Sequence, residues 1–571
     1  MARTPNEEAV CAWDGSFTYR QVSELSDRLG AHLRDSGVGP GVLVPLCFDK
    51  SKWYPVANLA VLKAGGACTA IDPTHPSERI RSILDATRAT VVITEPKYEK
   101  LFSGAQLVVV AIPRAIHAFA SVLDKGIPRR AKLHDTAFVV FTSGSTGVPK
   151  GILQSHASYA SSIAATTPVF TAPSRPRRRH LQFAAHTFDN CLSDMFVTLS
   201  TGGCVCIPSE QQRLDDLEGA IQAMRVNQAE LTPTVAGLLR PDKVAATLDT
   251  LALTGENATP AVIEAWAGKV DRLLNIYGPA EATILTTVKD NLSRNTHPLD
   301  IGRPVGGHAW IVDPHDADRL VPLGSIGELL LEGPYVSDGY LGQSKKTSLA
   351  FIQPPKWAVS LRHVLHGSGR FYRTGDLARY NPDGSIRLIG RNDTQIKLRG
   401  QRVELAGIEH HISGSEQVRH AAVVFPSSGP WRKSLVAVVV LSQSSPAPGP
   451  SPSPSSSVRP PPRIRLVEAD SQTSTVQRQV KRLREDLGSH LPIYMQPSMW
   501  LVVESIPLLS SGKLDRKLLK AFVESMSGVE AETARQSFLG NADVAGLKKT
   551  ELGTRPTSRA EQAILNPVLM F

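Results

Sequence analysis

The sequence predicts an α/β protein in which mainly parallel sheets are covered by helices. Short apolar runs of strand length alternate with segments whose apolar residues recur at helical spacing. Such alternation is typical of parallel strands that are joined by helices. The chain of 571 residues, 42% hydrophobic and 20% charged, is long enough for several hydrophobic cores, so we expect two or three structural units.

The first helix is predicted over residues 18–36. Its apolar residues recur at helical spacing, Thr18 and Gln21 have the form of a capping box, and Gly37 supplies a stop. Another helix is predicted over residues 76–87. Strands are predicted at the apolar runs 42–48, 67–71, 91–94, 107–112 and 137–141.

Composition and charge exclude some classes of function. The chain begins without the long apolar segment of a signal peptide and contains no run long enough to cross a bilayer, and its six cysteines are scattered without metal spacing. We therefore expect a cytoplasmic protein without a membrane partner. The net charge of +10 and the arginine cluster at residues 175–179 could suggest nucleic acid, but the cluster lies in a Pro/Ser-rich connection without aromatic residues. We interpret it as a solvated loop and expect no nucleic-acid partner.

The segment FTSGSTGVPKG, residues 141–151, directly follows an apolar run and predicts a loop that binds phosphate. Its glycines let the backbone approach an anion, and its hydroxyl groups and one lysine add donors and positive charge. A Walker A loop is excluded, because Pro149 and Gly151 stand where that motif needs glycine and a hydroxyl residue. ATP is the expected ligand; taken alone, the loop could also be an ordinary surface turn. The predicted phosphate-binding residues are Thr142, Ser143, Gly144, Ser145, Thr146, Gly147 and Lys150.

Further motifs follow in a fixed order: NIYGPAEATI (275–284), GELLLEGPYVSDGYL (327–341), YRTGDL (372–377), GRNDTQIKLRGQRVEL (390–405), LPIYMQP (491–497) and SSGKLDR (510–516). With the phosphate loop they resemble the signature of the adenylate-forming, AMP-binding enzymes, most closely the adenylation domains of fungal nonribosomal peptide synthetases. Residues 17–25 and 62–80 resemble two opening motifs of that subfamily. The resemblance extends from about residue 9 to about residue 520, and so many ordered motifs do not agree by chance.

The resemblance implies the domain organisation. Residues 1–392 are expected to form the large N-terminal domain, including a small barrel-like subdomain, and Asp393 is the expected hinge. Residues 393–522 are expected to form a small, mobile α+β lid domain. Its Pro/Ser-rich segment 442–462 is predicted to be a disordered insertion because it has almost no apolar residues. Residues 523–571 are interpreted as a linker and the truncated start of a carrier-like region, so that the chain is a single adenylation unit, freestanding or cut from a larger protein.

The implied reaction is the ATP-dependent activation of an amino acid as its adenylate, with release of pyrophosphate, followed by transfer to the phosphopantetheine thiol of a carrier domain. By the same resemblance, Thr142 and Lys513 are catalytic, Glu281 is catalytic and holds Mg²⁺, and Asp376 binds the ribose. Tyr277 is expected to stack on adenine, and Arg391 to contact the ribose or the phosphates. Singly, an aspartate or arginine of this kind is more often a residue of an ion pair or turn.

The resemblance also implies the amino-acid pocket. Asp189 matches the carboxylate that pairs with the substrate's α-ammonium group, which favours an amino acid over a fatty or aryl acid; the alternative is an aspartate that caps a helix. Glu230 favours a cationic or hydrogen-bond-donating side chain, such as an ornithine-like one, or else it is a solvated residue. The predicted pocket residues are Asp189, Asn190, Ser193, Glu230, Ala252, Thr254, Ile276, Ile284 and Leu285, closed by Lys513.

The sequence departs from the family pattern at a few positions. Ala280 stands where threonine is frequent, and Ser510 and Ser511 precede the catalytic lysine where Asn-Pro is common. Ala406 and Gly407 replace a Gly-Glu pair, which puts thioester formation in more doubt than adenylation. The alternatives to a peptide-synthetase adenylation domain are an acyl-CoA synthetase-like ligase and a non-catalytic remnant that binds nucleotide.

Overall fold

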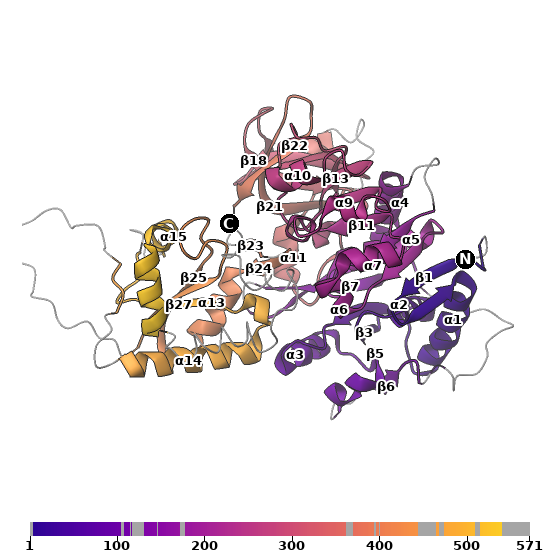
Figure 1. Ribbon diagram of the computed structural model, residues 1–571, viewed down its shortest axis with the longest axis horizontal. Coiled ribbons are helices and arrows are strands. Elements are labelled where there is room, and N and C mark those ends of the chain that lie inside the picture. The colour runs from indigo at the N-terminus through magenta and orange to yellow at the C-terminus, as the bar shows by residue number, and fades with distance from the viewer. Residues whose placement is uncertain are drawn as a thin grey trace, which may run out of the picture.

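The computed structural model describes residues 4–103, 108–114, 116, 131–144, 147–171, 177–360, 369–392, 395–398, 400–442, 464–467, 473–508 and 514–538. Two large sheets with helices on their faces make up the N-terminal part, and a smaller lobe of strands and helices follows (Figure 1). The predicted α/β class is confirmed. Among the helices that the structure describes, none is both long and apolar enough to cross a membrane.

The first sheet contains the strands that were predicted from the apolar runs. Its order is β19-β8-β7-β4-β3-β5-β6, and the strands β4, β3, β5 and β6 pair in parallel, as does β4 with β7. The antiparallel pair β7 and β8 carries the phosphate loop between its strands. The bounds are β3 (Leu43–Cys47), β4 (Ala67–Ile71), β5 (Val91–Thr94), β6 (Val108–Ala111), β7 (Thr136–Thr142), β8 (Lys150–Ser155) and β19 (Gly339–Tyr340).

Two of the helices around this sheet, α1 and α3, begin within one residue of where the sequence predicts. Helix α1 (Tyr19–Asp35) starts with the predicted capping box, in which the Thr18 side chain accepts from the backbone N–H of Gln21 and the Gln21 side chain accepts from that of Thr18. Gly37 follows it with a φ of 89°, a left-handed conformation that suits glycine. Helices α2 (Trp53–Ala64) and α3 (Ser77–Thr87) complete this part, with α1 packed on α2.

The second sheet has a parallel and an antiparallel half. Strands β10, β9, β11, β12 and β13 pair in parallel, and from β13 onward the pairing is antiparallel. The expected barrel-like subdomain is therefore an antiparallel continuation of this sheet. The bounds are β1 (Glu8–Ala12), β2 (Gly15–Thr18), β9 (Arg179–Leu181), β10 (Cys204–Ile207), β11 (Gln228–Leu231), β12 (Thr250–Leu253), β13 (Arg272–Tyr277), β14 (Thr287–Lys289), β15 (Asp300–Pro304), β16 (His308–Asp313), β17 (Asp316–Leu320), β18 (Gly327–Glu332), β20 (Phe351–Ile352), β21 (Phe371–Tyr380) and β22 (Ile386–Arg391).

Helices connect the strands of the second sheet. The longest are α4 (His156–Phe170) and α5 (Asp189–Ser200), which contact each other. The shorter ones are α6 (Glu210–Asp215), α7 (Leu217–Ala223), α8 (Pro233–Ala236), α9 (Pro241–Val244), α10 (Pro260–Trp266), α11 (Ser344–Ala350), α12 (Lys356–Ser360) and the 3₁₀ turns at Pro96–Phe102 and Ala280–Ala282.

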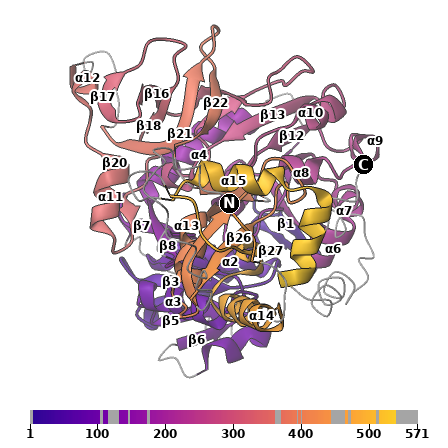
Figure 2. The same cartoon turned by 90° about the vertical axis from the view of Figure 1, so that its left-hand side faces the viewer.

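The C-terminal lobe has a hydrophobic core of its own, built from residues between Leu398 and Phe538. Its sheet joins β25 (Val418–Val424), β26 (Val436–Leu441) and β27 (Met499–Val502), and its helices are α13 (Leu405–Ser413), α14 (Thr473–His490) and α15 (Arg516–Ser525). Figure 2 looks onto this lobe, with α14 and α15 nearest the viewer. The hairpin of β23 (Gln395–Leu398) and β24 (Gln401–Glu404) connects it to the N-terminal part. The hinge Asp393 and residues 443–462 of the predicted insertion lie outside the described residues.

Candidate functional site

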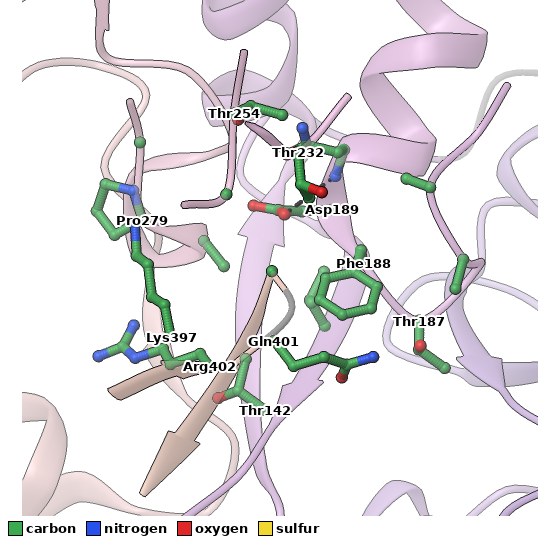
Figure 3. Close-up of a pocket in the computed structure, with 18 of the residues that line it drawn as sticks. Thr142, Thr187, Phe188, Asp189, Thr232, Thr254, Pro279, Lys397, Gln401 and Arg402 are labelled. Carbon is green, nitrogen blue, oxygen red and sulfur yellow. Dashed lines mark hydrogen bonds between the residues drawn. The ribbon is translucent and has the colours of Figure 1, made fainter. Parts of the chain in front are cut away.

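A cavity of about 330 Å³ lies where strands of both sheets end and where the β23–β24 hairpin meets them. Parallel strands β11, β12 and β13 end at Leu231, Leu253 and Tyr277, and the residues that follow them line the cavity. The carboxyl ends of parallel strands are the usual place for a ligand in an α/β fold. In Figure 3, Thr142 and Asp189 belong to the N-terminal part, and Lys397, Gln401 and Arg402 approach from the hairpin.

The predicted phosphate loop borders this cavity. Thr142 lines it, and the Thr142 hydroxyl is buried without a hydrogen-bond partner among the described residues. The Ser143 hydroxyl donates to the backbone carbonyl of Arg402 at 2.7 Å. A Cβ atom on Gly144 would lie 2.2 Å from the Val148 carbonyl, so the tight loop requires glycine there. Gly147 has a φ of 76°. Ser145 and Thr146 lie outside the described residues.

Glu281, the expected metal ligand, is fully buried and surrounded by donors. Arg402 donates to its Oε2 at 2.8 Å, Tyr340 donates to its Oε1 at 3.0 Å, and the Lys150 ammonium lies 3.4 Å from Oε1. Burial opposes the charge, but Arg402 and Lys150 outweigh it and lower the pKa of Glu281 to about 2. Glu281 is therefore an ionised carboxylate whose oxygens face cations, which is the chemistry that a magnesium ligand needs.

The expected nucleotide-binding residues form one connected group. Tyr277 donates to Oδ2 of Asp376 at 2.5 Å, and Arg391 donates to Oδ1 at 2.7 Å. The Lys397 ammonium lies 5.5 Å from the centre of the Tyr277 ring. Tyr277, Asp376, Arg391 and Lys397 all line the cavity. The Asp376 carboxylate can therefore accept further hydrogen bonds from a polar ligand beside an aromatic ring.

Asp189 is the first residue of α5, so the chain aims its carboxylate at the cavity from a helix N-terminus. The alternative that Asp189 caps the helix is wrong, because Phe188 occupies the cap position and makes no side-chain cap bond. Burial raises the pKa of Asp189 to about 6. Asn190, its neighbour, donates to Oε2 of Glu230 at 3.3 Å.

The remaining predicted pocket residues divide into two groups. Glu230, Thr254 and Ile276 line the cavity with Asp189 and Asn190. The alternative that Glu230 is solvated is wrong, since it lies in β11 and only 4% of it is exposed. Ser193, Ala252, Ile284 and Leu285 are buried around the cavity but are not among the residues that line it. Lys513 lies outside the described residues.

Two groups of residues in this region had no role assigned from the sequence. The hairpin contributes Gly400, Gln401 and Arg402 to the cavity; they belong to a quoted motif, but only the structure shows which of them face the site. Arg178, which was interpreted as part of a solvated arginine loop, is 5% exposed and stacks on Phe170, so that interpretation is wrong for Arg178. The sequence pattern that could have indicated the burial of Arg178 is a charged residue directly before an apolar strand.

The fold and the site define an adenylate-forming architecture, and the chain belongs to the family of AMP-binding enzymes, whose model matches residues 1–341. The nonribosomal peptide synthetase atnA of Emericella nidulans is 42% identical over 565 residues, which are 98% of this chain and 8% of that protein. Nonribosomal peptide synthetase 1 of Aspergillus fumigatus is 42% identical over 527 residues, which are 92% of this chain and 8% of that protein. The resemblance predicted from the motifs is confirmed, and the chain spans less than a tenth of these relatives' length.

A solved structure has the same fold. NpsA-ThdA of Klebsiella oxytoca, an artificially fused adenylation–PCP di-domain, has a TM-score of 0.70 to this chain, with 22% sequence identity. The match covers 87% of this chain and 91% of that one. At this identity the comparison establishes the shared architecture.

Proposed function

We propose that this chain activates an amino acid as its adenylate, using ATP and releasing pyrophosphate, and passes the aminoacyl group to the phosphopantetheine thiol of a peptidyl carrier domain. The observation that carries the proposal is one cavity lined by two chemically different groups of residues. Asp189 supplies a carboxylate for an α-ammonium group, and Tyr277 with Asp376 supplies an aromatic face and a hydroxyl acceptor in the same cavity. The phosphate loop lies beside them.

The residues present fit ATP and Mg²⁺. The buried Thr142 hydroxyl has no hydrogen-bond partner among the described residues, and a phosphate oxygen would supply the acceptor that it needs. Glu281 is ionised and offers oxygen ligands for a hard cation, and Asp376 can accept from ribose hydroxyls. When bound, ATP supplies the adenylyl group, and Mg²⁺ offsets the charge of its phosphates. The chain's own residues hold the two reactants in line and exclude water.

The contact between the β23–β24 hairpin and Glu281 supports a role for the observed arrangement of the two lobes in the second half-reaction, which is the transfer of the aminoacyl group to the thiol. Arg402 donates a hydrogen bond to Oε2 of Glu281, and the Ser143 hydroxyl donates to the Arg402 carbonyl, so the hairpin lies directly beside the phosphate loop. Adenylation requires Glu281 to be free for a metal ion, and we infer that the hairpin withdraws for that step. The arrangement with the hairpin in place then suits the entry of a thiol after pyrophosphate has left.

The Ala406-Gly407 departure is compatible with this arrangement. A Cβ atom on Gly407 would lie 2.4 Å from the carbonyl oxygen of Gly144, so the glycine allows α13 to pack directly on the phosphate loop. A glutamate at position 407 could not take the same place. The departure therefore does not by itself argue for the non-catalytic remnant.

The test is exchange of labelled pyrophosphate into ATP across a panel of amino acids, with Lys513→Ala and Asp189→Ala as variants. Exchange that depends on an amino acid and on Lys513 supports the proposal. Asp189→Ala separates the alternatives: an acyl-CoA synthetase-like ligase accepts acids without an α-amino group and tolerates this substitution, whereas an amino-acid-activating enzyme loses activity. Bound ATP without any exchange would indicate the non-catalytic remnant.

A further inference from the structure

A buried lysine beside the cavity connects the two sheets. Lys50 lies in the turn between β3 and α2, and only 2% of it is exposed. Its ammonium donates to the backbone carbonyl of Gln182 at 3.2 Å, to Oε1 of the same residue at 2.7 Å and to the carbonyl of Ala184 at 2.8 Å. An ammonium has three hydrogens, so these three oxygens use its full capacity as a donor.

The oxygens that Lys50 holds belong to the segment that leads to Asp189. Residues 182–188 connect β9 to α5 without forming a helix or strand, and all but the first of them line the cavity. Gln182 Nε2 also donates to the Ala184 carbonyl at 2.7 Å. Because such a segment lacks the repeating backbone bonds of a helix or sheet, its shape depends on individual contacts of this kind. Lys50 therefore holds the start of the segment whose last residue precedes Asp189.

Other residues next to Lys50 hold the middle of the segment. The His186 ring stacks on that of Tyr54, with centroids 3.6 Å apart and planes at 9°. His186 Nδ1 lies 3.3 Å from the carbonyl oxygen of Phe48, and since a carbonyl can only accept, Nδ1 is the donor. Burial, and then the charge of Lys50, lower the pKa of His186 well below its usual value, so the ring stays neutral. The segment is thus fixed at two points by residues 48–54.

The turn that carries Lys50 is itself held in place. Trp13 Nε1 donates to the Lys50 carbonyl at 2.6 Å, and Asp14 accepts from the backbone N–H of Lys52 at 3.0 Å. Lys50 therefore reaches the segment from a fixed support, which a precise positioning residue needs.

Placing a charged lysine here costs free energy. Burial lowers the pKa of Lys50 to about 8. Arg213 from α6 lowers this pKa further, and Cys191 and Asp194 from α5 and Glu210 from α6 oppose the effect of burial; His186 is the other titratable group that faces the ammonium. All the hydrogen bonds described for the ammonium go to uncharged oxygens. A methionine would fill the same space without a buried charge, so the particular contribution of the lysine is its hydrogen bonds.

We propose that Lys50 is a positioning residue, whose buried ammonium holds residues 182–188 in the shape that presents Phe188 and Asp189 to the cavity. This inference rests on the proposed function, in which Asp189 binds the α-ammonium group of the amino acid. Lys50 is not among the residues that line the cavity, so it acts on the substrate through this segment. Without its three hydrogen bonds the segment is less ordered, and binding of the amino acid must then also order the carboxylate that receives it.

The first test is hydrogen exchange of the free protein, measured by mass spectrometry on peptides that cover residues 182–190. Lys50→Met removes the donors and keeps the length of the side chain. We expect the amides of the segment to exchange at least about ten-fold faster in this variant, while peptides from α4 and β12 keep their protection. Lys63→Met is the matched control: Lys63 donates to the Ser23 carbonyl and the Ser26 hydroxyl, and its loss should leave residues 182–190 unchanged.

The second test separates the amino acid from ATP in pyrophosphate exchange. The residues proposed for the nucleotide, Tyr277 and Asp376, belong to other elements, β13 and β21. Lys50→Met should therefore raise the KM for the amino acid by about ten-fold and change the KM for ATP by less than about two-fold. Gln182→Met removes one of the same contacts from the other side. The double variant should lose little more than Lys50→Met alone, because both substitutions act on the same hydrogen bonds.

The results distinguish this inference from the proposed function. Unchanged protection of residues 182–190 in Lys50→Met, or faster exchange throughout the chain, overturns the inference whatever the activity. Equal rises in both KM values, or fully additive losses in the double variant, also overturn it. Gln182→Met carries both measurements if Lys50→Met does not fold. If no amino acid supports pyrophosphate exchange in the unchanged protein, the proposed function fails, and hydrogen exchange of the segment alone decides whether Lys50 orders it.

Discussion

Arg402 in the C-terminal hairpin donates a 2.8 Å hydrogen bond to Glu281, a fully buried residue of the N-terminal part. The contact joins residues that are 121 positions apart. It places the guanidinium on an oxygen of the carboxylate that we propose as the metal ligand. If Glu281 holds the metal ion as proposed, Arg402 and that ion compete for one carboxylate, and the position of the hairpin decides between them.

We predict that Arg402→Ala impairs the two half-reactions unequally. Thioester formation should fall by about ten-fold or more, because the hairpin loses its anchor beside the phosphate loop. Amino-acid-dependent pyrophosphate exchange should change by less than about three-fold, because the proposed withdrawal of the hairpin already removes Arg402 from Glu281 in that half-reaction. Arg373→Ala, which breaks the ion pair with Glu328 elsewhere in the N-terminal part, is the control. Equal losses in both half-reactions would argue against the proposed withdrawal of the hairpin.

A second prediction concerns the packing of α13 on the phosphate loop. Alanine favours a helix by about 1 kcal/mol over glycine, so Gly407→Ala should stabilise an unhindered helix. Here its Cβ would lie 2.4 Å from the Gly144 carbonyl, and we expect slower thioester formation instead. Gly414→Ala, at the C-terminal end of the same helix, meets no atom closer than 3.4 Å and serves as the control. A Gly407→Ala variant as active as Gly414→Ala in loading a carrier would contradict this packing.

The sequence predicted the parts of the fold that depend on local chemistry. The strands 67–71 and 91–94 and the capping box at Thr18 are where the apolar runs and the hydroxyl residue placed them, because burial and capping act within a few residues. The hydrogen bonds of Glu281 could not be predicted from the sequence, because its partners Arg402 and Tyr340 come from distant segments of the chain. Only tertiary structure brings them together.

The sequence could not reveal the buried polar cluster of Arg178, His180, Asp194 and Glu230 for the same reason. Arg178 stands in a run of arginines that reads as a solvated loop, and His180 and Asp194 lie in apolar surroundings without a motif. Their meeting with Glu230 depends on the pairing of β9 with β11 and on the packing of α5 against β9. Side chains that project from neighbouring elements onto one buried spot have no spacing rule in the sequence.

The hydrogen bond between Tyr277 and Asp376 gives a third prediction. Tyr277→Phe keeps the aromatic face but removes the donor to Oδ2, so Asp376 loses one of the two contacts that orient it. We expect the KM for ATP to rise by about five- to ten-fold, with little change in the KM for the amino acid, since about 1 kcal/mol is typical of one such hydrogen bond. Tyr335→Phe removes another buried hydroxyl, one that donates to the Glu332 carbonyl, and controls for general destabilisation. A rise in the KM for the amino acid alone would indicate that Tyr277 acts on the amino acid and not on the nucleotide, which would contradict this prediction.

The final prediction is a pH dependence that arises from Asp189. Burial raises the pKa of this carboxyl to about 6, and only its ionised form pairs with an α-ammonium group. In the free protein the charged form is lost as the pH falls through this value, so kcat/KM for the amino acid should fall by about ten-fold for each unit below it. Asp189→Asn should lower kcat/KM at neutral pH by about a hundred-fold and abolish this inflection, because the amide does not titrate. The measurement is pyrophosphate exchange between pH 5 and pH 8 at low amino-acid concentration with saturating ATP. An inflection that persists in Asp189→Asn would belong to another group and would remove Asp189 from its proposed role in binding the substrate's amino group.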